Sequence, residues 1–415
     1  MRNRTACAIC AVLALASACG GGGGGSSLGP PPPTGQNVAP IIVDSGPAAA
    51  VNVVNTAYVT VTLCAPGGMT CQTIDHVSVD TGSYGFRVIA SVLNSSLAQA
   101  LPQTQASSGQ PLVECTKFAD GYVWGPVKTA DLKISGEEAL SVPIQVIGDS
   151  AFPDSTVPSD CSSAGVQENT VALFGANGIL GIGVFREDCG SGCTTVVQPG
   201  WYYSCPASGC AGTTVTLAQQ VQNPVFHFTT DNNGVIVELQ SVGPAGAPTV
   251  SGSLVFGIDT QSNNTLGSAT VLMVDANYGE FTTLFNTQTA NQTLTASIID
   301  SGSNGLFFPD SDSTMKACTD STGKPTGFYC PASTQSLSAT MQSVTSVMKN
   351  VSFSIANADA LLGNNLTYFA FGNLGGSNPS ASSFDWGLPF FYGRNVFVAI
   401  EGQTTSAGMG PFFAF

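Results

Sequence analysis

The feature that most constrains the fold of this chain is a short segment that occurs twice. Val77–Phe86 and Ser297–Leu306 are each an apolar stretch that ends in Asp, a hydroxyl residue, Gly, Ser, one variable residue, Gly and an apolar residue. A carboxylate at the end of a buried strand is costly unless it is paired or used in chemistry. The duplication therefore predicts two similar lobes, each of which delivers one aspartate.

The two aspartates of this repeat, Asp80 and Asp300, are expected to face each other. Two carboxyl groups in contact cannot both ionise cheaply, so the pair would share one proton. One carboxylate could then act as general base while the other carboxyl acts as general acid. A single Asp-Thr-Gly is an ordinary turn sequence, and it is the matching pair that predicts a catalytic site.

Composition sets broad limits on the class of protein. The chain has 415 residues, of which 43% are apolar, so it is long enough for two packed domains. Only 9% of the residues are charged, which is typical of exported β-rich proteins. The net charge of −15 makes nucleic acid an unfavourable partner, and none is expected.

The N-terminus has the pattern of an export signal. Arg2 and Arg4 precede an apolar run, 6–16, that is too short to span a bilayer as a mature helix, so residues 1–18 are predicted to be a signal peptide. The run ends in Leu-Ala-Ser-Ala before Cys19, which is similar to a bacterial lipobox. That similarity implies cleavage before Cys19 and lipidation of its side chain, and the alternative is an ordinary secretory signal.

The segment that begins at Cys19 predicts how the folded part would be attached to a membrane. Residues 19–49 are rich in Gly and Pro and are expected to form a tether between a membrane and the folded part. We therefore expect an exported protein that is lipid-anchored to the bacterial cell envelope at the outer membrane.

The cysteines predict disulfides. When Cys7, Cys10 and Cys19 are set aside, an even number remains, which fits five bridges in an oxidising compartment. Short spacing favours four pairs and leaves one, although spacing alone does not fix the connectivity: Cys64 with Cys71, Cys189 with Cys193, Cys205 with Cys210, Cys318 with Cys330, and Cys115 with Cys161. A metal site in the cluster between 189 and 210 is the alternative, and it has no histidine nearby. No metal or cofactor is expected.

The rest of the chain is predicted to be mostly β. Short alternating apolar runs are cut by Gly, Pro, Asn and Asp, as in 58–63, 140–147, 235–239 and 396–400. Helical periodicity is limited to 91–101, 216–222 and 336–348. A Gly/Pro segment at 243–248 predicts a boundary between an N-terminal lobe, 50–245, and a C-terminal lobe, 246–415.

Each aspartate segment is followed about a hundred residues later by an apolar strand with glycine, Asn177–Gly183 and Trp386–Arg394. With these strands in place, the chain from about residue 50 to 415 resembles the pepsin-like aspartic peptidases. The resemblance implies a bilobal acid-protease fold of two related β-barrel-like lobes with a cleft between them, and Asp80 and Asp300 as the catalytic residues. The chain is also similar to uncharacterised proteobacterial lipoproteins.

The resemblance implies roles for further residues. Residues 222–228 and 252–257 would be the last strands of the first lobe and the crossover, and 118–125 would be the flap hairpin over the substrate. The groups expected to support the carboxylates are Thr81, Gly82, Ser83, Ser301, Gly302 and Ser303. The side chains expected to contact apolar substrate groups are Phe118, Tyr122, Trp124, Phe307 and Phe308.

Three positions depart from the family pattern. Phe118 stands where the flap usually has a tyrosine, Arg87 where a tryptophan is common, and Pro389 where glycine is usual. These departures bear on how a substrate would be handled. They do not affect the two aspartate segments.

The sequence predicts a monomeric, membrane-tethered aspartic endopeptidase. It would hydrolyse peptide bonds of a peptide or protein substrate with a water molecule activated by Asp80 and Asp300. The alternative is a catalytically inactive pepsin-like surface lipoprotein that acts as a binding scaffold. A Ser-His-Asp or Cys-His site would have to use His76 or His227, the two histidines of the chain, and both suit a structural role better.

Overall fold

A computed structural model describes residues 35–286, 291–309 and 315–415. The expected signal peptide, Cys19 and the tether up to residue 34 lie outside the described residues. The described residues belong to one compact unit by their contacts. None of the helices in the described ranges is long and apolar enough to cross a membrane.

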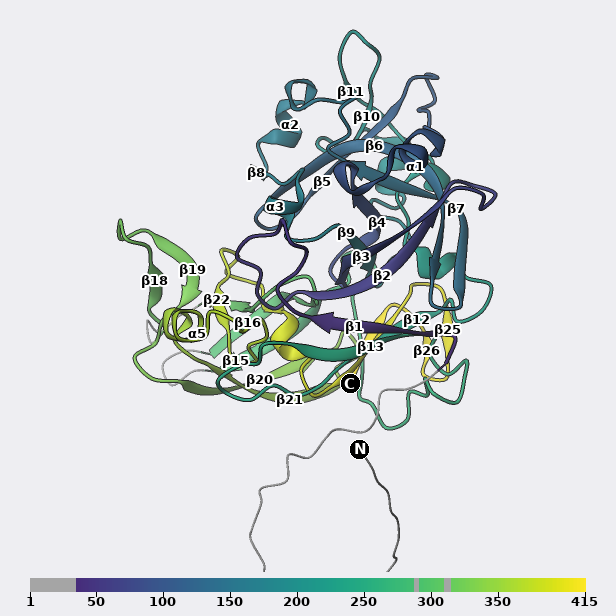
Figure 1. Cartoon of the computed structure of the whole chain (residues 1–415). Coiled ribbons are helices and arrows are strands. Elements are labelled where there is room, and N and C mark those ends of the chain that lie inside the picture. The colour runs from purple at the N-terminus through teal and green to yellow at the C-terminus, as the bar shows by residue number, and fades with distance from the viewer. Residues whose placement is uncertain (1–34, 287–290, 310–314) are drawn as a thin grey trace, which may run out of the picture. The chain divides into compact units, whose positions relative to one another are not determined.

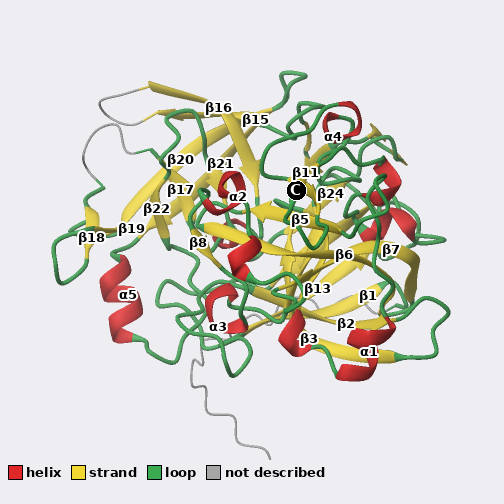
Figure 2. Ribbon diagram, turned by 90° about the horizontal axis from the view of Figure 1, so that it is seen from above, coloured by secondary structure: helices red, strands yellow, loops and turns green. Residues whose placement is uncertain are grey.

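Strands dominate the structure, and the helices are short (Figure 2). In spatial order, the larger sheet contains β11 (Ala211–Gly212), β10 (Tyr202–Ser204), β5 (Leu112–Lys117), β6 (Gly121–Ile134), β7 (Glu137–Ile147), β4 (Tyr84–Ile89), β9 (Gly178–Ile182), β3 (Cys71–Asp80), β2 (Ala57–Cys64), β1 (Val38–Val43), β13 (Val250–Phe256), β12 (Gly234–Leu239), β24 (Asn395–Ala399), β27 (Phe412–Ala414) and β14 (Val271–Met273), with β8 (Val166–Gln167) beside β6.

A second sheet belongs to the C-terminal part of the chain. Its strands, in spatial order, are β18 (Ala317–Thr319), β19 (Pro325–Tyr329), β22 (Gly375–Ser377), β17 (Leu306–Phe308), β23 (Asp385–Trp386), β16 (Asn291–Ile299), β15 (Phe281–Asn286), β20 (Gln335–Gln342) and β21 (Met348–Ile355). β25 (Thr404–Thr405) and β26 (Gly408–Met409) form a separate pair. The α-helices are α1 (Ser95–Ala100), α2 (Ser159–Ser162), α3 (Val171–Phe174), α4 (Gly192–Thr195) and α5 (Ala358–Asn364).

The two aspartate segments lie in equivalent strand arrangements. β3 ends at Asp80, pairs antiparallel with β2 and parallel with β9, and β4 pairs antiparallel with β9. In the second sheet, β16 ends one residue before Asp300, pairs antiparallel with β15 and parallel with β23, and β17 pairs antiparallel with β23. The predicted mostly-β fold with two related lobes is confirmed.

Strands from the start, the middle and the end of the described chain join the lobes. β1 pairs with both β2 and β13, and β12 pairs with both β13 and β24, as Figure 1 shows below the N-terminal lobe. The larger sheet therefore crosses the predicted boundary at 245/246, and that boundary stays a prediction. The expectation that the tether runs to residue 49 is wrong for β1, because Ala39, Ile41 and Val43 alternate into the core.

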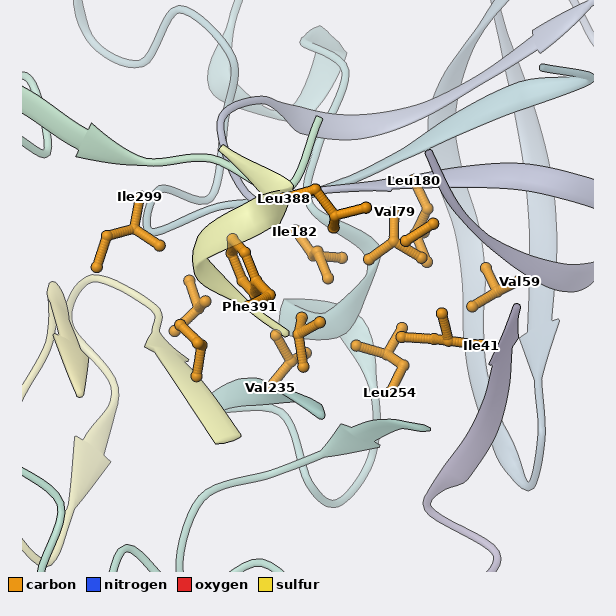
Figure 3. Packing of buried hydrophobic residues seen from close by; sticks show 14 of the residues in the cluster. Ile41, Val59, Val79, Leu180, Ile182, Val235, Leu254, Ile299, Leu388 and Phe391 are labelled. Carbon is orange, nitrogen blue, oxygen red and sulfur yellow. The ribbon is translucent and has the colours of Figure 1, made fainter. Parts of the chain in front are cut away.

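The main core holds the aspartate segments in place. Val79 and Ile299, the residues just before Asp80 and Asp300, are both fully buried in one hydrophobic cluster. Figure 3 shows them with other members of this cluster, among them Leu180, which is the strand partner of Val79. Apolar burial of this kind stabilises by about 25 cal/mol per Å², so the two strands are firmly anchored where the aspartates begin.

Most of the strands expected from the sequence are present, and three local expectations are wrong. Trp386–Arg394, expected as an apolar strand, is in a strand only at Trp386 and forms a 3₁₀-helix at Leu388–Phe390, where Pro389 cannot donate to a sheet. Residues 336–348, predicted to be helical, belong to the hairpin of β20 and β21, because alternation of buried Ala339 and Met341 with more exposed residues has the period of a strand. Residues 222–228, expected as a strand, contain a 3₁₀-helix, Pro224–His227, in which the Val225 N–H donates to the capping side chain of Asn223.

All five disulfides expected from spacing are formed: Cys64–Cys71, Cys115–Cys161, Cys189–Cys193, Cys205–Cys210 and Cys318–Cys330. The alternative of a metal bound between 189 and 210 is wrong, because every cysteine of that cluster is consumed in a disulfide. Four of the bridges close local loops. Cys115–Cys161 spans 46 residues and ties α2 to β5.

This difference in span predicts a difference in stability. Replacing Cys115 and Cys161 by alanine should lower the free energy of unfolding by about 4 kcal/mol, since the longer loop restrains the unfolded chain more. The matched control is the double alanine variant of Cys189 and Cys193, which closes only four residues and should cost about 2 kcal/mol. Urea unfolding of the oxidised proteins measures both, and equal losses would contradict the assignment.

Candidate active site

Asp80 and Asp300 meet in the structure, each held by its own loop. The Gly82 N–H donates to Asp80 Oδ1 over 2.8 Å, and the Ser83 hydroxyl donates to Asp80 Oδ2. On the other side, the Gly302 N–H donates to Asp300 Oδ1 over 2.8 Å. The two carboxyls lie close together, because a Cβ on Gly302 would lie 2.6 Å from Asp80 Oδ1 and 3.1 Å from Asp300 Oδ1. The structure thus brings together the two side chains that the sequence repeat singled out.

The glycines of both loops are required by this close approach. A Cβ on Gly82 would lie 2.5 Å from Asp300 Cγ, and one on Gly302 would lie 2.6 Å from Asp80 Oδ1. Any larger residue at either position would push the opposite carboxyl away. Both glycines are exposed, so no side chain covers the carboxyl pair at these two positions.

The hydroxyls of Thr81 and Ser301 have a different role from the one expected. Thr81 Oγ1 donates to the Ile299 carbonyl over 2.9 Å and accepts the Ser301 N–H over 2.9 Å. Ser301 Oγ donates to the Val79 carbonyl over 2.7 Å and accepts the Thr81 N–H over 3.1 Å. The expectation that these two orient the carboxylates is wrong, because their hydroxyls are fully used in joining the backbones of the two loops.

The environment of the pair favours a shared proton. Asp80 is only 5% exposed. Burial raises the pKa of Asp80 well above its ordinary value, and the neighbouring Asp300 carboxylate raises it further. The pair therefore retains one proton at pH values where an exposed carboxyl has lost it.

Two residues of the site were missed from the sequence. Tyr84 follows Ser83, and its pKa is raised by burial and by the negative charge of Asp80 and Asp300. Asp385 in β23 lies 2.6 Å from the Ser303 hydroxyl. The signal for Asp385 was present, since it is a charged residue between Phe384 and Trp386 in an apolar strand.

Arg87, one of the departures from the family pattern, is buried beside the first aspartate loop. Its guanidinium contacts Glu114 Oε1 at 2.5 Å and Asp188 Oδ2 at 3.1 Å, and it donates to the Tyr84 carbonyl over 2.7 Å. Burial and the Glu114 carboxylate raise the pKa of Asp188 well above its ordinary value. This buried ionic cluster joins β4 to β5, the first strand of the expected flap.

The expected flap is a hairpin, formed by β5 and β6, but its aromatic residues are packed inward. Phe118 at the turn is half-buried against Phe174, with ring centroids 5.9 Å apart. Tyr122 is buried, and Trp124 is fully buried against Tyr203. The assignment of Trp124 as a substrate contact is wrong for this structure, because the side chain belongs to the core of the lobe.

The aromatic residues expected from the second lobe divide in the same way. Phe308 is buried in a cluster with Phe285 and Phe384, so it does not face a substrate. Phe307 is half-buried and packs against Phe328. Of the predicted aromatic contacts, Phe118 and Phe307 keep part of their surface accessible.

Two cavities in the described part of the chain are lined by residues other than the carboxyl pair. A cavity of about 630 Å³ in the C-terminal lobe is lined by Trp386, Phe390 and Arg394 among others, and neither aspartate belongs to its lining. Within the described ranges, the one cluster of possible metal ligands is Cys318, Cys330 and Asp359, in which the two cysteines form a disulfide. His76 lies 3.3 Å from Asp44, and His227 is hydrogen-bonded to Gln222.

Comparison with solved structures shows that this fold is similar to that of an aspartic proteinase. The aspartic proteinase from Irpex lacteus is similar over 91% of this chain and 96% of its own, with a TM-score of 0.51 and 16% sequence identity. At that identity the likeness shows the fold alone. Residues 33–415 match the family described as "Protein of unknown function (DUF3443)", and the chain belongs to that family. No curated protein matches the chain.

The hydrogen bonds between the loops predict a stability effect. Thr81→Val keeps the shape of the side chain but leaves the Ser301 N–H and the Ile299 carbonyl without this partner. We expect a loss of about 2–4 kcal/mol in the free energy of unfolding. Thr62→Val is the matched control, because Thr62 bonds only Thr73 at the surface and its loss should cost less than about 0.5 kcal/mol. Urea unfolding that shows equal effects would contradict the role of Thr81.

Proposed function

We propose that this protein is an aspartic endopeptidase that hydrolyses peptide bonds with water activated by Asp80 and Asp300. The observation that carries the proposal is the close approach of these two carboxyls, each held by a glycine N–H and a serine hydroxyl. Two carboxyls that share one proton supply both a general base and a general acid. The pepsin-like fold supports the proposal but does not carry it, because the same fold can serve binding.

The chemistry balances with these two groups alone. The ionised carboxylate removes a proton from the water, whose oxygen attacks the carbonyl carbon of the scissile bond. The protonated carboxyl gives its proton to the carbonyl oxygen, so that a neutral tetrahedral intermediate forms. Transfer of a proton to the amide nitrogen then breaks the C–N bond and releases an amine and a carboxylic acid. The pair finishes with one proton, as it began.

The substrate is proposed to be a peptide or an unfolded protein with apolar side chains near the cleaved bond. Phe118 and Phe307 retain accessible aromatic surface in the two lobes, which favours apolar groups. Phe118 has no hydroxyl, so the hairpin would close over a substrate without a hydrogen bond from this position. The proposed product class is short peptides.

The shared proton predicts cleavage at acidic pH. Cleavage of an unfolded protein should be fastest where the pair holds one proton, and should fall as rising pH removes it. Asp80→Asn and Asp300→Asn should each abolish cleavage, as followed by release of peptides from casein between pH 3 and 8. Asp75→Asn is the matched control, since Asp75 is exposed in the same strand and should leave the rate unchanged.

Stability provides a second readout of the same variants. The pKa of Asp80 is raised on folding, so its ionisation destabilises the fold as pH rises above the ordinary carboxyl value. Asp80→Asn should therefore leave the melting temperature at pH 7 unchanged or raise it. If wild-type protein cleaves nothing at any pH and statine-type inhibitors do not bind, the binding scaffold becomes the better account.

We also propose that the protein is exported and attached to the cell envelope by lipid on Cys19. The support is the sequence alone: a short apolar signal ending in small residues before Cys19, followed by a Gly/Pro-rich segment. A lipid chain there would hold the peptidase near the membrane surface.

Lipidation is tested by changing the one residue that it needs. Mature protein from bacterial cells should carry lipid on Cys19 by mass spectrometry and should pellet with membranes. Cys19→Ser should block processing or release the protein to the soluble fraction, whereas Ser17→Ala should change neither. A mature N-terminus beyond Cys19 without lipid would favour ordinary secretion.

A further inference from the structure

A third carboxyl group lies at the aspartate pair and is bridged to it by a single hydroxyl. Ser303 Oγ lies 2.8 Å from Asp300 Oδ2 and 2.6 Å from Asp385 Oδ2. The other oxygen of Asp385, Oδ1, is buried and has no hydrogen-bond partner in the described part of the chain. Asp385 comes from β23, the returning strand that pairs with β16.

Counting protons shows which carboxyl is neutral. A serine hydroxyl has one proton, so Ser303 can donate to Asp300 or to Asp385 but not to both. The second short contact needs a proton on one of the carboxyls. Asp300 is the better acceptor, because its Oδ1 also receives the Gly302 N–H over 2.8 Å. Asp385 has a buried oxygen without a donor, which makes its charged form costly, so the proton belongs on Asp385.

The electrostatic surroundings agree with this placement. Burial raises the pKa of Asp385 well above its ordinary value, and the charges of Asp300 and Asp80 raise it further, against a smaller opposite effect of the Ser303 hydrogen bond. The facing strand β17 places Phe307 opposite Asp385 and contributes no charged group. The charge of the aspartate pair that acts on Asp385 is therefore negative.

The first lobe has no equivalent of this group. Ile298 lies two residues before Asp300 and pairs with Asp385. Ser78 lies two residues before Asp80 and pairs with Ile179, so Ile179 occupies the position that corresponds to Asp385. Ile179 is buried and apolar. The third carboxyl thus makes the two halves of the site chemically different, although their loops are alike.

We propose that Asp385 is a positioning residue of the aspartate pair: its protonated carboxyl donates to Ser303 Oγ, and this commits the Ser303 proton to Asp300. The chain of donors runs from Asp385 through Ser303 to Asp300. It fixes Asp300 as a hydrogen-bond acceptor through both of its oxygens, which suits a general base. The inference rests on the proposed peptidase function for its kinetic effect, but not for the protonation of Asp385.

The kinetic test replaces Asp385 in two ways. Asp385→Ile installs the residue of the equivalent position in the first lobe and removes the donor. It should lower kcat about tenfold, the effect of losing one hydrogen bond to a charged group, and leave KM within about twofold. Asp385→Asn keeps an N–H that can donate to Ser303 and should recover most of that loss. Equal kcat for the isoleucine variant and wild type would overturn the proposal.

A double-mutant cycle tests the route through Ser303. Asp385→Ile and Ser303→Ala break the same chain, so their combined effect on kcat should be close to that of either alone. Ser83→Ala is the matched control, because Ser83 serves Asp80 in the other lobe and its effect should multiply with that of Asp385→Ile. Multiplying effects in the Asp385 and Ser303 pair would overturn the proposal.

A measurement of stability separates this inference from the proposed function. If Asp385 is protonated in the folded protein but ionised in the unfolded chain, wild type binds more protons when folded and loses stability as pH rises above about 4. Its folding equilibrium constant should fall, relative to Asp385→Asn, by up to about tenfold per pH unit between pH 4 and 6.

This readout decides the inference even if other variants fail. The gap is the difference in folding stability between wild type and Asp385→Asn. If wild type cleaves nothing but this gap changes with pH as expected, the peptidase function is refuted and the protonated Asp385 is supported. A gap that does not change between pH 4 and 6 would overturn the inference, whether or not the protein cleaves. The asparagine substitution preserves shape, so the result does not depend on the isoleucine variant folding.

Discussion

The structure depends on one reciprocal set of hydrogen bonds between the lobes. Thr81 and Ser301 each donate from the hydroxyl to a backbone carbonyl of the opposite loop and accept a backbone N–H from it. All four bonds are buried, so none is weakened by competition from water. They fix the distance between Asp80 and Asp300 against the repulsion of two carboxyls. Without them, the glycines that permit close approach would also permit the loops to separate.

Much of this arrangement could be predicted from the sequence because it depends on local sequence patterns. The repeat identified Asp80 and Asp300, alternation identified most strands, and spacing identified the disulfides. The roles of Thr81 and Ser301 could not be read in this way, because their partners lie in the other loop. Residues 336–348 were misjudged since polar residues obscured a strand period that only pairing with β21 makes clear.

Partners distant in sequence also explain why the buried charges were misread. Arg87 was recognised only as a departure from the family pattern, and its neighbours Glu114 and Asp188 gave no sign of contact. Trp124 was assigned to the substrate from its place in the hairpin, but Tyr203 covers it. For both residues, the sequence predicts the strand in which the side chain lies. Which face of that strand is buried depends on segments that come much later in the chain.

The two lobes place a buried ionisable residue on opposite members of the same strand pair. In the first lobe, Arg87 of β4 lies opposite Ile179 of β9, and in the second, Phe307 of β17 lies opposite Asp385 of β23. In the first lobe, Arg87 of β4 and its two carboxylate partners therefore support the aspartate loop. In the second lobe, the carboxyl of Asp385 in β23 supports it. The first cluster carries its own counter-charge, whereas the charge that acts on Asp385 is the negative charge of the aspartate pair. Symmetric backbones thus hold two aspartates in unequal surroundings, and such inequality favours one member of the pair over the other as the site of the shared proton.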